Sequence, residues 1–191
     1  MNEKKLLLIK TALQLFYSNG INLVSISEIV KESGVAKKTL YHHFSSKEQL
    51  VLATLKYRDH LFCQWFESIL NSKQTGQESI LALFYGLDNW FNNKVAGLDE
   101  FKGCYFINTA AEYGDSNSFI RRSCKEHKYK ISLLIKEKVS MFIKKTDECE
   151  VVANAISLLK EGAIVSASVE GNSNAALKCL PIVLILINKE Y

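Results

Sequence analysis

Residues 25–47, SISEIVKESGVAKKTLYHHFSSK, constrain the fold of this chain more than any other stretch. Ser25 followed by Glu28 is the spacing at which a hydroxyl and a carboxylate reciprocally cap the free N–H groups of a helix start. Gly34 ends that first helical pattern, because glycine adopts a left-handed backbone without steric cost. A second helix is expected from Ala36 to Phe44. The stretch therefore predicts two short helices joined by a tight glycine turn.

The second of these helices carries cations and hydroxyls on its outer sides. Leu40 and Phe44 stand four residues apart and form its inward face. The remaining positions are Lys37, Lys38, Thr39, Tyr41, His42 and His43. Lysines and hydroxyls suit phosphate oxygens, and the first residues of such a helix can reach base edges in the major groove. The pattern is typical of a DNA-binding helix-turn-helix, while an ordinary helix pair with a solvated basic face is the alternative.

The sequence GVAKKTLYHHFSSKEQLVLA at residues 34–53 resembles the signature of the TetR family of one-component bacterial transcriptional repressors. Upstream of this stretch, the family pattern is also matched in order and spacing by Ile9, Ala12, Leu15, Phe16, Gly20, Ser25, Ile29 and Val30. The resemblance covers roughly the first 55 residues. It implies a homodimer that binds a palindromic DNA operator, most often as a repressor, and that a small-molecule inducer releases.

The resemblance also implies which residues contact DNA. Phosphate contacts are expected for Thr39, Tyr41 and Lys47, and base contacts for Lys37, Lys38 and His42, with Ser25 among the DNA-contacting residues. Two positions depart from the family pattern. Ala36 replaces a frequent serine, so a cap of the recognition helix is expected to be lost. Lys38 replaces a frequent glycine and adds a positive charge that would alter base choice.

Positive charge is concentrated near the N-terminus. Residues 1–58 hold nine Lys and Arg against four acidic residues, a net charge of +5, whereas residues 59–191 hold fifteen against sixteen, a net charge of −1. This asymmetry is expected of a chain that contacts nucleic acid through its N-terminal part.

One proline and nine glycines among 191 residues favour long helices with few irregular loops. Helical spacing of apolar residues recurs along the chain and no strand alternation persists, so the predicted fold is all-α with about nine helices. Beyond the helix-turn-helix, the predicted helices are 3–19, 46–70, 77–95, 100–113, 118–145, 148–169 and 173–189. The predicted domains are a helix-turn-helix head at 1–46 and a ligand-binding and dimerisation domain at 47–191, entered through a connecting helix at 47–70.

The last two predicted helices, 148–169 and 173–189, are apolar on more than one side. A helix of this kind must be covered by other apolar surface. The same pair from a second subunit would cover it in a symmetric four-helix interface, and a palindromic operator also requires two heads. An intramolecular core is the alternative.

The sequence contains no GxSxG, GxGxxG, P-loop or HExxH motif, so neither an enzyme nor a cofactor is expected. Cys124 and His127 could supply two metal ligands on one helix face, but a site needs three or four, so no metal site is predicted. The five cysteines form no CxxC pair, and no apolar leader follows Met1. The most apolar run, 180–187, is too short to span a bilayer. A cytoplasmic protein is expected.

Aromatic residues gather in the middle of the chain with a few polar ones among them. Ligand pockets have this composition, although core aromatics have it too, and that a pocket lies here is implied by the family resemblance. The predicted ligand-binding residues are Trp65, Phe66, Phe84, Trp90, Phe91, Cys104, Tyr105, Asn108, Thr109, Glu112 and His127.

Cys104 supports an alternative hypothesis. It follows a glycine at a predicted helix start, where the helix dipole would stabilise a reactive thiolate, although an ordinary buried cysteine is the commoner case. The alternative function is a small-molecule or thiol-redox sensor that acts through a protein partner instead of DNA.

Overall fold

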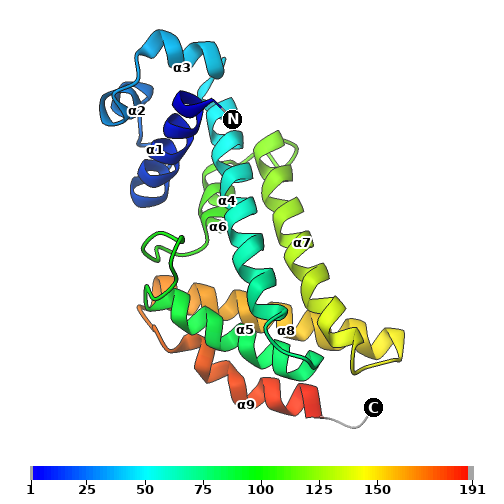
Figure 1. Cartoon of the computed structure of the whole chain (residues 1–191). Coiled ribbons are helices and arrows are strands. Elements are labelled where there is room, and N and C mark those ends of the chain that lie inside the picture. The colour runs from blue at the N-terminus through cyan, green and yellow to red at the C-terminus, as the bar shows by residue number, and fades with distance from the viewer. Residues whose placement is uncertain (1, 189–191) are drawn as a thin grey trace. The chain divides into compact units, whose positions relative to one another are not determined.

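The computed structural model describes residues 2–188 (Figure 1). Within that range the chain forms nine α-helices and no strand, which confirms the predicted all-α class. The helices are α1 Glu3–Asn19, α2 Ile26–Ser33, α3 Lys37–His43, α4 Lys47–Leu70, α5 Gly76–Phe91, α6 Tyr105–Glu112, α7 Phe119–Ser140, α8 Thr146–Val169 and α9 Ala175–Asn188. Residue 189, the predicted end of the last helix, lies outside the described residues, as do Met1 and Tyr191 at the ends of the two predicted domains.

The helices form two compact units. The first contains residues 1–60 and 104–127, and the second contains residues 61–103 and 128–191. Both α4 and α7 contribute residues to each unit. The division into domains at 1–46 and 47–191 concerns function, and it remains a prediction.

In the first unit, the helix ends at Ser25, Gly34 and Ala36 match the sequence predictions, except that Ser25 and Glu28 form one of the two hydrogen bonds of the predicted capping box. The Asn2 side chain accepts a hydrogen bond from the N–H of Lys4, and the Ser25 hydroxyl accepts one from the N–H of Glu28 at 3.1 Å. Gly34 ends α2 with a left-handed φ of 65°. Ala36 precedes α3 and provides no side-chain cap, as expected from its departure from the family pattern.

The long helix α4 begins beside the head. The Ser46 hydroxyl accepts a hydrogen bond from the N–H of Gln49, while the Gln49 side chain accepts one from the N–H of Ser45. The reciprocal bond thus reaches one residue further back than in an ordinary capping box. The predicted 46–70 helix is present as the 24-residue α4.

In the second unit, α5, α8 and α9 pack against one another. Figure 1 shows these three helices lying together. Helix α5 starts with a complete capping box between Thr75 and Glu78. It ends at Phe91, four residues before its predicted end, and the chain then takes a left-handed turn at Asn93 with φ 59°. Helix α7 also ends earlier than predicted, at Ser140.

By length and mean hydropathy alone, α8 could cross a membrane, since its most apolar window averages 1.3. Core helices of folded domains pass the same test, and α8 packs along α9 in this fold. Its buried residues are Cys149, Val152, Ala153, Ile156, Lys160, Ala163, Ile164 and Ala167.

Candidate nucleic-acid interface and effector site

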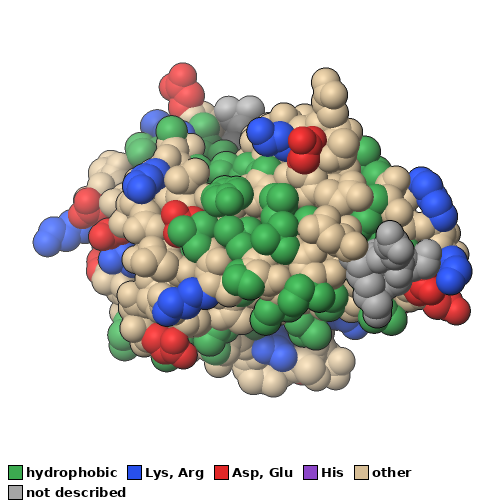
Figure 2. Space-filling view, turned by 90° about the horizontal axis from the view of Figure 1, so that it is seen from below, with side chains coloured by type: hydrophobic (Ala, Val, Ile, Leu, Met, Phe, Trp, Pro, Cys, Tyr) green, Lys and Arg blue, Asp and Glu red, His purple; other side chains and the backbone are tan. Residues whose placement is uncertain are grey.

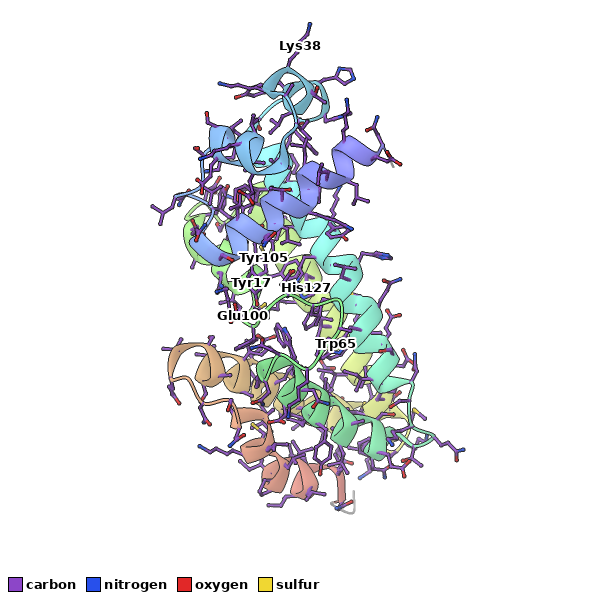
Figure 3. The ribbon with its side chains drawn as sticks, turned by 60° about the vertical axis from the view of Figure 1, so that its left-hand side comes forward. Tyr17, Lys38, Trp65, Glu100, Tyr105 and His127 are labelled. Carbon is purple, nitrogen blue, oxygen red and sulfur yellow. The ribbon has the colours of Figure 1, made fainter. Side chains whose placement is uncertain are left out.

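Helix α3 presents its predicted DNA-contacting side chains to solvent. Lys37, Lys38 and His42 are exposed, Tyr41 is 47% exposed, and Thr39 is half-buried. Figure 3 shows Lys38 extending outward from the turn of helix that carries it. Cations and hydroxyls in this arrangement can neutralise and hydrogen-bond phosphate oxygens.

The opposite face of α3 anchors the helix in the head. Leu40 is fully buried, and Phe44, just beyond the helix, is 3% exposed. The Lys5 ammonium lies over the Phe44 ring, 5.6 Å from its centroid. The four-residue spacing of Leu40 and Phe44 therefore fixes which side of α3 faces outward.

The turn between α1 and α2 is held from two sides. The Glu112 carboxylate at the end of α6 accepts hydrogen bonds from the N–H groups of Ile21, at 2.8 Å, and Asn22, at 2.7 Å. The Lys47 ammonium donates a hydrogen bond to the carbonyl of Ile21 and lies over the Phe16 ring. We call the turn formed by residues 20–23 the clamped turn.

Two predicted roles can be compared with this geometry. Lys47 was expected at a phosphate and Glu112 in a ligand pocket, whereas in the structure both hold the clamped turn. Ser25 likewise caps α2 through its hydroxyl oxygen. The predicted DNA contacts and ligand contacts remain predictions.

A buried polar group lies between α4, α6 and α1 in the first unit. The Tyr105 and Thr54 hydroxyl oxygens are 2.8 Å apart, and the Tyr105 ring packs edge-on against Tyr17. Burial raises the pKa of the Tyr105 phenol well above its usual value, although the hydrogen bond with Thr54 opposes the shift. Tyr105 therefore stays protonated and able to donate.

His127 lies in the same unit, and Figure 3 shows it near Tyr105 and Tyr17. Its Nδ1 is 2.7 Å from a carboxylate oxygen of Asp59, and its ring stacks on Phe106 with centroids 3.5 Å apart. The Asp59 contact fixes the orientation of the imidazole. Of the other predicted polar residues, Thr109 is buried and Asn108 is exposed.

Cys104 precedes α6 as its N-cap residue and is 6% exposed. Its backbone has the extended conformation of a cap, but its side chain makes no capping hydrogen bond. Helix α6 starts at Tyr105, five residues after the start of the predicted 100–113 helix, so Cys104 does lie at a helix start. The reactivity of its thiol stays a hypothesis.

In the second unit, aromatic rings form a continuous cluster. Trp90 packs against Phe62, Trp65 and Phe101 with ring centroids 5.2, 5.8 and 4.9 Å away. Phe91 also packs against Phe101, with ring centroids 4.8 Å apart. We call these five rings the aromatic cluster. Its predicted members are Trp65, Trp90 and Phe91.

One polar atom in the aromatic cluster is exceptional. The indole Nε1 of Trp90 is buried and has no hydrogen-bond partner among the described residues. A buried N–H group without an acceptor costs free energy, so such atoms are rare and mark places where an acceptor can be bound. Phe66 and Phe84, also predicted as ligand contacts, are completely buried.

Sequence reasoning missed several of these residues. Phe101 falls inside the predicted 100–113 helix, but the structure places it in the loop before α6, which starts only at Tyr105. Asp59 is one of three acidic residues in α4. No local signal distinguishes them. Phe62 was visible in the apolar pattern of α4, and its contact with Trp90 depends on α5 packing beside it.

Comparisons with known proteins agree with this arrangement. Residues 8–54 match the family model described as bacterial regulatory proteins, tetR family. Over 76 residues the chain is 43% identical to the uncharacterized HTH-type transcriptional regulator YuxN of Bacillus subtilis (strain 168), across 40% of this chain and 25% of YuxN. Over 115 residues it is 30% identical to the HTH-type transcriptional repressor ComR of Escherichia coli (strain K12), across 60% of this chain and 53% of ComR.

The fold extends the similarity beyond the head. SCO4454, a TetR-family transcriptional regulator from Streptomyces coelicolor, has a crystal structure that matches with a TM-score of 0.86 and 25% sequence identity. That match covers 98% of this chain and 97% of the other. By contrast, the chain spans a quarter of YuxN and about half of ComR. These relatives are transcriptional regulators, a class of proteins that are not enzymes.

Proposed function

We propose that this chain, which belongs to the TetR family of bacterial regulatory proteins, is a ligand-responsive repressor that binds a palindromic operator as a homodimer in the cytoplasm. The observation that carries the proposal is the outer face of α3. Lys37, Lys38 and His42 are exposed on that helix beside Tyr41, while Leu40 anchors it in the head. In a helix-turn-helix protein, such a helix lies in the major groove.

The apolar faces of α8 and α9 support the homodimer. Figure 2 shows the molecule from below, from the side of α9 in Figure 1. Hydrophobic side chains gather in the middle of this face. The large apolar residues exposed on these two helices are Val151, Leu158, Val165, Val169, Ile182, Leu184 and Ile185. Exposed apolar surface of this kind favours a self-complementary contact with a second copy.

The aromatic cluster supports an inducer site. Its rings offer apolar surface, and the unpartnered Nε1 of Trp90 offers one hydrogen-bond donor. The inducer would then combine an apolar body with an acceptor such as a carbonyl or carboxylate oxygen. Binding at a desolvated indole N–H adds specificity, because the donor is unsatisfied until the acceptor arrives.

The proposed mechanism is a shift in population between two states. Helix α4 runs without interruption from Lys47, beside the head, to Leu70, and it carries Phe62 and Trp65 of the aromatic cluster. An inducer that binds one state more tightly would favour a spacing of the two heads that no longer matches major grooves about 34 Å apart. Cross-linking the heads at the operator spacing should abolish induction, and induction that survives the cross-link would contradict this mechanism.

The DNA-binding proposal predicts the behaviour of a Lys38→Ala, Tyr41→Ala double variant. Operator affinity should fall at least about tenfold, because one exposed cation and one hydroxyl are removed from the interface. Fluorescence-polarisation titrations against DNA from immediately upstream of the gene, at two salt concentrations, measure the loss. The double variant should also show a weaker salt dependence, since it releases fewer counterions.

A matched control is Lys144→Ala, which removes an exposed lysine outside the head. Its operator affinity should equal that of the wild type. If the wild type binds neither the upstream fragment nor any fragment selected from random sequence, the DNA-binding proposal fails. A sensor acting through a protein partner would then take its place.

The clamped turn gives a second prediction. Glu112→Ala removes the acceptor of two backbone N–H groups, and charge-assisted bonds of this kind contribute about 2 kcal/mol to stability. Hydrogen exchange at the amides of Ile21 and Asn22 should accelerate, and operator affinity should fall because the entry to α2 loosens. Glu126→Ala, which removes an exposed carboxylate from α7, should change neither property. Unchanged exchange at both amides in Glu112→Ala would contradict the clamp.

A further inference from the structure

A groove of about 570 Å³ opens in the first unit and shares no residue with the aromatic cluster. The first turns of α4 form one wall, and the end of α6 and the start of α7 form the other. The lining residues are Glu48, Gln49, Leu52, Tyr113, Ser118, Phe119 and Ile120. The volume falls within the range of small-molecule sites, and the walls are mainly apolar. Phe119, at the start of α7, is 71% exposed.

The groove contains one charged lining residue, Glu48. The pKa of the Glu48 carboxyl is lowered by hydrogen bonds from its own backbone N–H and from the Ser46 hydroxyl. The Lys47 charge also lowers it, and together these effects outweigh the desolvation that would raise it. Burial, followed by the charges of Glu48 and Glu112, raises the pKa of Tyr113. Glu48 is therefore an anion, and the Tyr113 hydroxyl beside it remains neutral.

The cations near the groove are engaged with other groups. The Lys47 ammonium donates to the Ile21 carbonyl, and an Arg121 guanidinium nitrogen donates to the Ala110 carbonyl at 2.6 Å. The Arg122 guanidinium lies over the Phe119 ring, 4.4 Å from its centroid. Among the described residues, no lysine, arginine or histidine lines the groove. Apolar walls around a single carboxylate complement a molecule that is apolar and positively charged.

We propose that this groove is a binding site for an apolar organic cation, with the cationic centre held by Glu48 and the apolar body packed on Leu52, Phe119 and Ile120. The aromatic face of Tyr113 adds attraction for the same charge, while the Phe119 ring, which already lies under Arg122, supplies apolar surface. The site is separate from the proposed inducer site and does not depend on DNA binding. Two of its lining residues are next in sequence to the residues that hydrogen-bond the clamped turn, since Glu48 follows Lys47 and Tyr113 follows Glu112.

The test uses two ions of matched size and shape but opposite charge, tetraphenylphosphonium and tetraphenylborate. Each is titrated by isothermal calorimetry into the full-length protein without DNA, so the result is independent of the proposed function. The cation should bind at least about tenfold more tightly than the anion, because only the cation is attracted to Glu48. Equal affinities, or tighter binding of the anion, would overturn the proposal.

Variants locate the site. Glu48→Gln should weaken binding of tetraphenylphosphonium about fivefold by removing the charge, and Glu126→Gln should leave it unchanged. Leu52→Trp should prevent binding by filling the groove, which provides a second test if Glu48→Gln destabilises the start of α4. Circular dichroism confirms that each variant is folded. Wild-type affinity in a folded Leu52→Trp variant would show that the cation binds elsewhere and would refute the assignment.

Discussion

Leu158→Glu should separate the proposed dimer into monomers and weaken operator binding by about a thousandfold, because each head alone contributes only one half of the contacts. Leu158 is 72% exposed on α8, among the apolar residues proposed to meet a second copy. In a symmetric interface the substitution would bury two carboxylates without partners. Analytical ultracentrifugation measures the separation, and polarisation titration measures the operator affinity.

The control for this prediction is Tyr129→Glu, which adds the same charge at a ring that is 64% exposed on α7. That variant should keep the oligomeric state and operator affinity of the wild type. Ile185→Glu on α9 should behave like Leu158→Glu, since both helices are proposed to form the interface. A monomeric wild type, or a dimer that survives both substitutions, would show that these helix faces have another role.

Gly76→Ala should destabilise the second unit by about 3 kcal/mol, which for a chain of this size lowers Tm by roughly 6–12 °C. Gly76 begins α5, and a Cβ atom there would lie 2.2 Å from the backbone carbonyl oxygen of Lys138 and 2.8 Å from the Phe142 ring. A carbonyl at the end of α7 cannot move aside as a flexible side chain can. Thermal unfolding followed by circular dichroism measures the effect.

Gly114→Ala is the matched comparison, because a Cβ atom at Gly114 would meet no atom within 4 Å. The chemical change is identical, so the difference between the two variants isolates the steric contact at Gly76. We expect Gly114→Ala to remain within about 1 kcal/mol of the wild type. If Gly76→Ala unfolds at the wild-type temperature, the close approach of α5 to the end of α7 is wrong.

The sequence predicted what local chemistry determines. The Ser25 half of the predicted capping box, the left-handed Gly34 and the uncapped Ala36 each depend on a few neighbouring residues, and the structure has all three. Apolar spacing also placed the helices, because the buried face of each helix repeats along the chain. Their ends were less accurate: the pattern that suggested a helix to residue 145 continues past the turn that ends α7 at Ser140.

Contacts between distant residues could not be predicted in this way. Glu112 was assigned to a ligand pocket because of its aromatic neighbours, yet its carboxylate binds the backbone of Ile21, which is 91 residues away. Phe101 completes the aromatic cluster from a loop that the sequence predicts as the first turn of the 100–113 helix. The groove beside Glu48 likewise depends on residues 113–120 lying against α4, which no short motif encodes.

The clamp formed by Lys47 and Glu112 recognises only the backbone of the turn that it holds. Its hydrogen bonds end on peptide N–H and C=O groups, while the side chain of Asn22 is exposed and that of Leu23 is 83% exposed. Asn22 and Leu23 can therefore change without altering the hydrogen bonds of the clamp. Proline at residue 21 or 22 is the exception, because it has no N–H to donate. Substitutions at these two positions, proline at 22 excepted, are thus compatible with an unchanged geometry of the head.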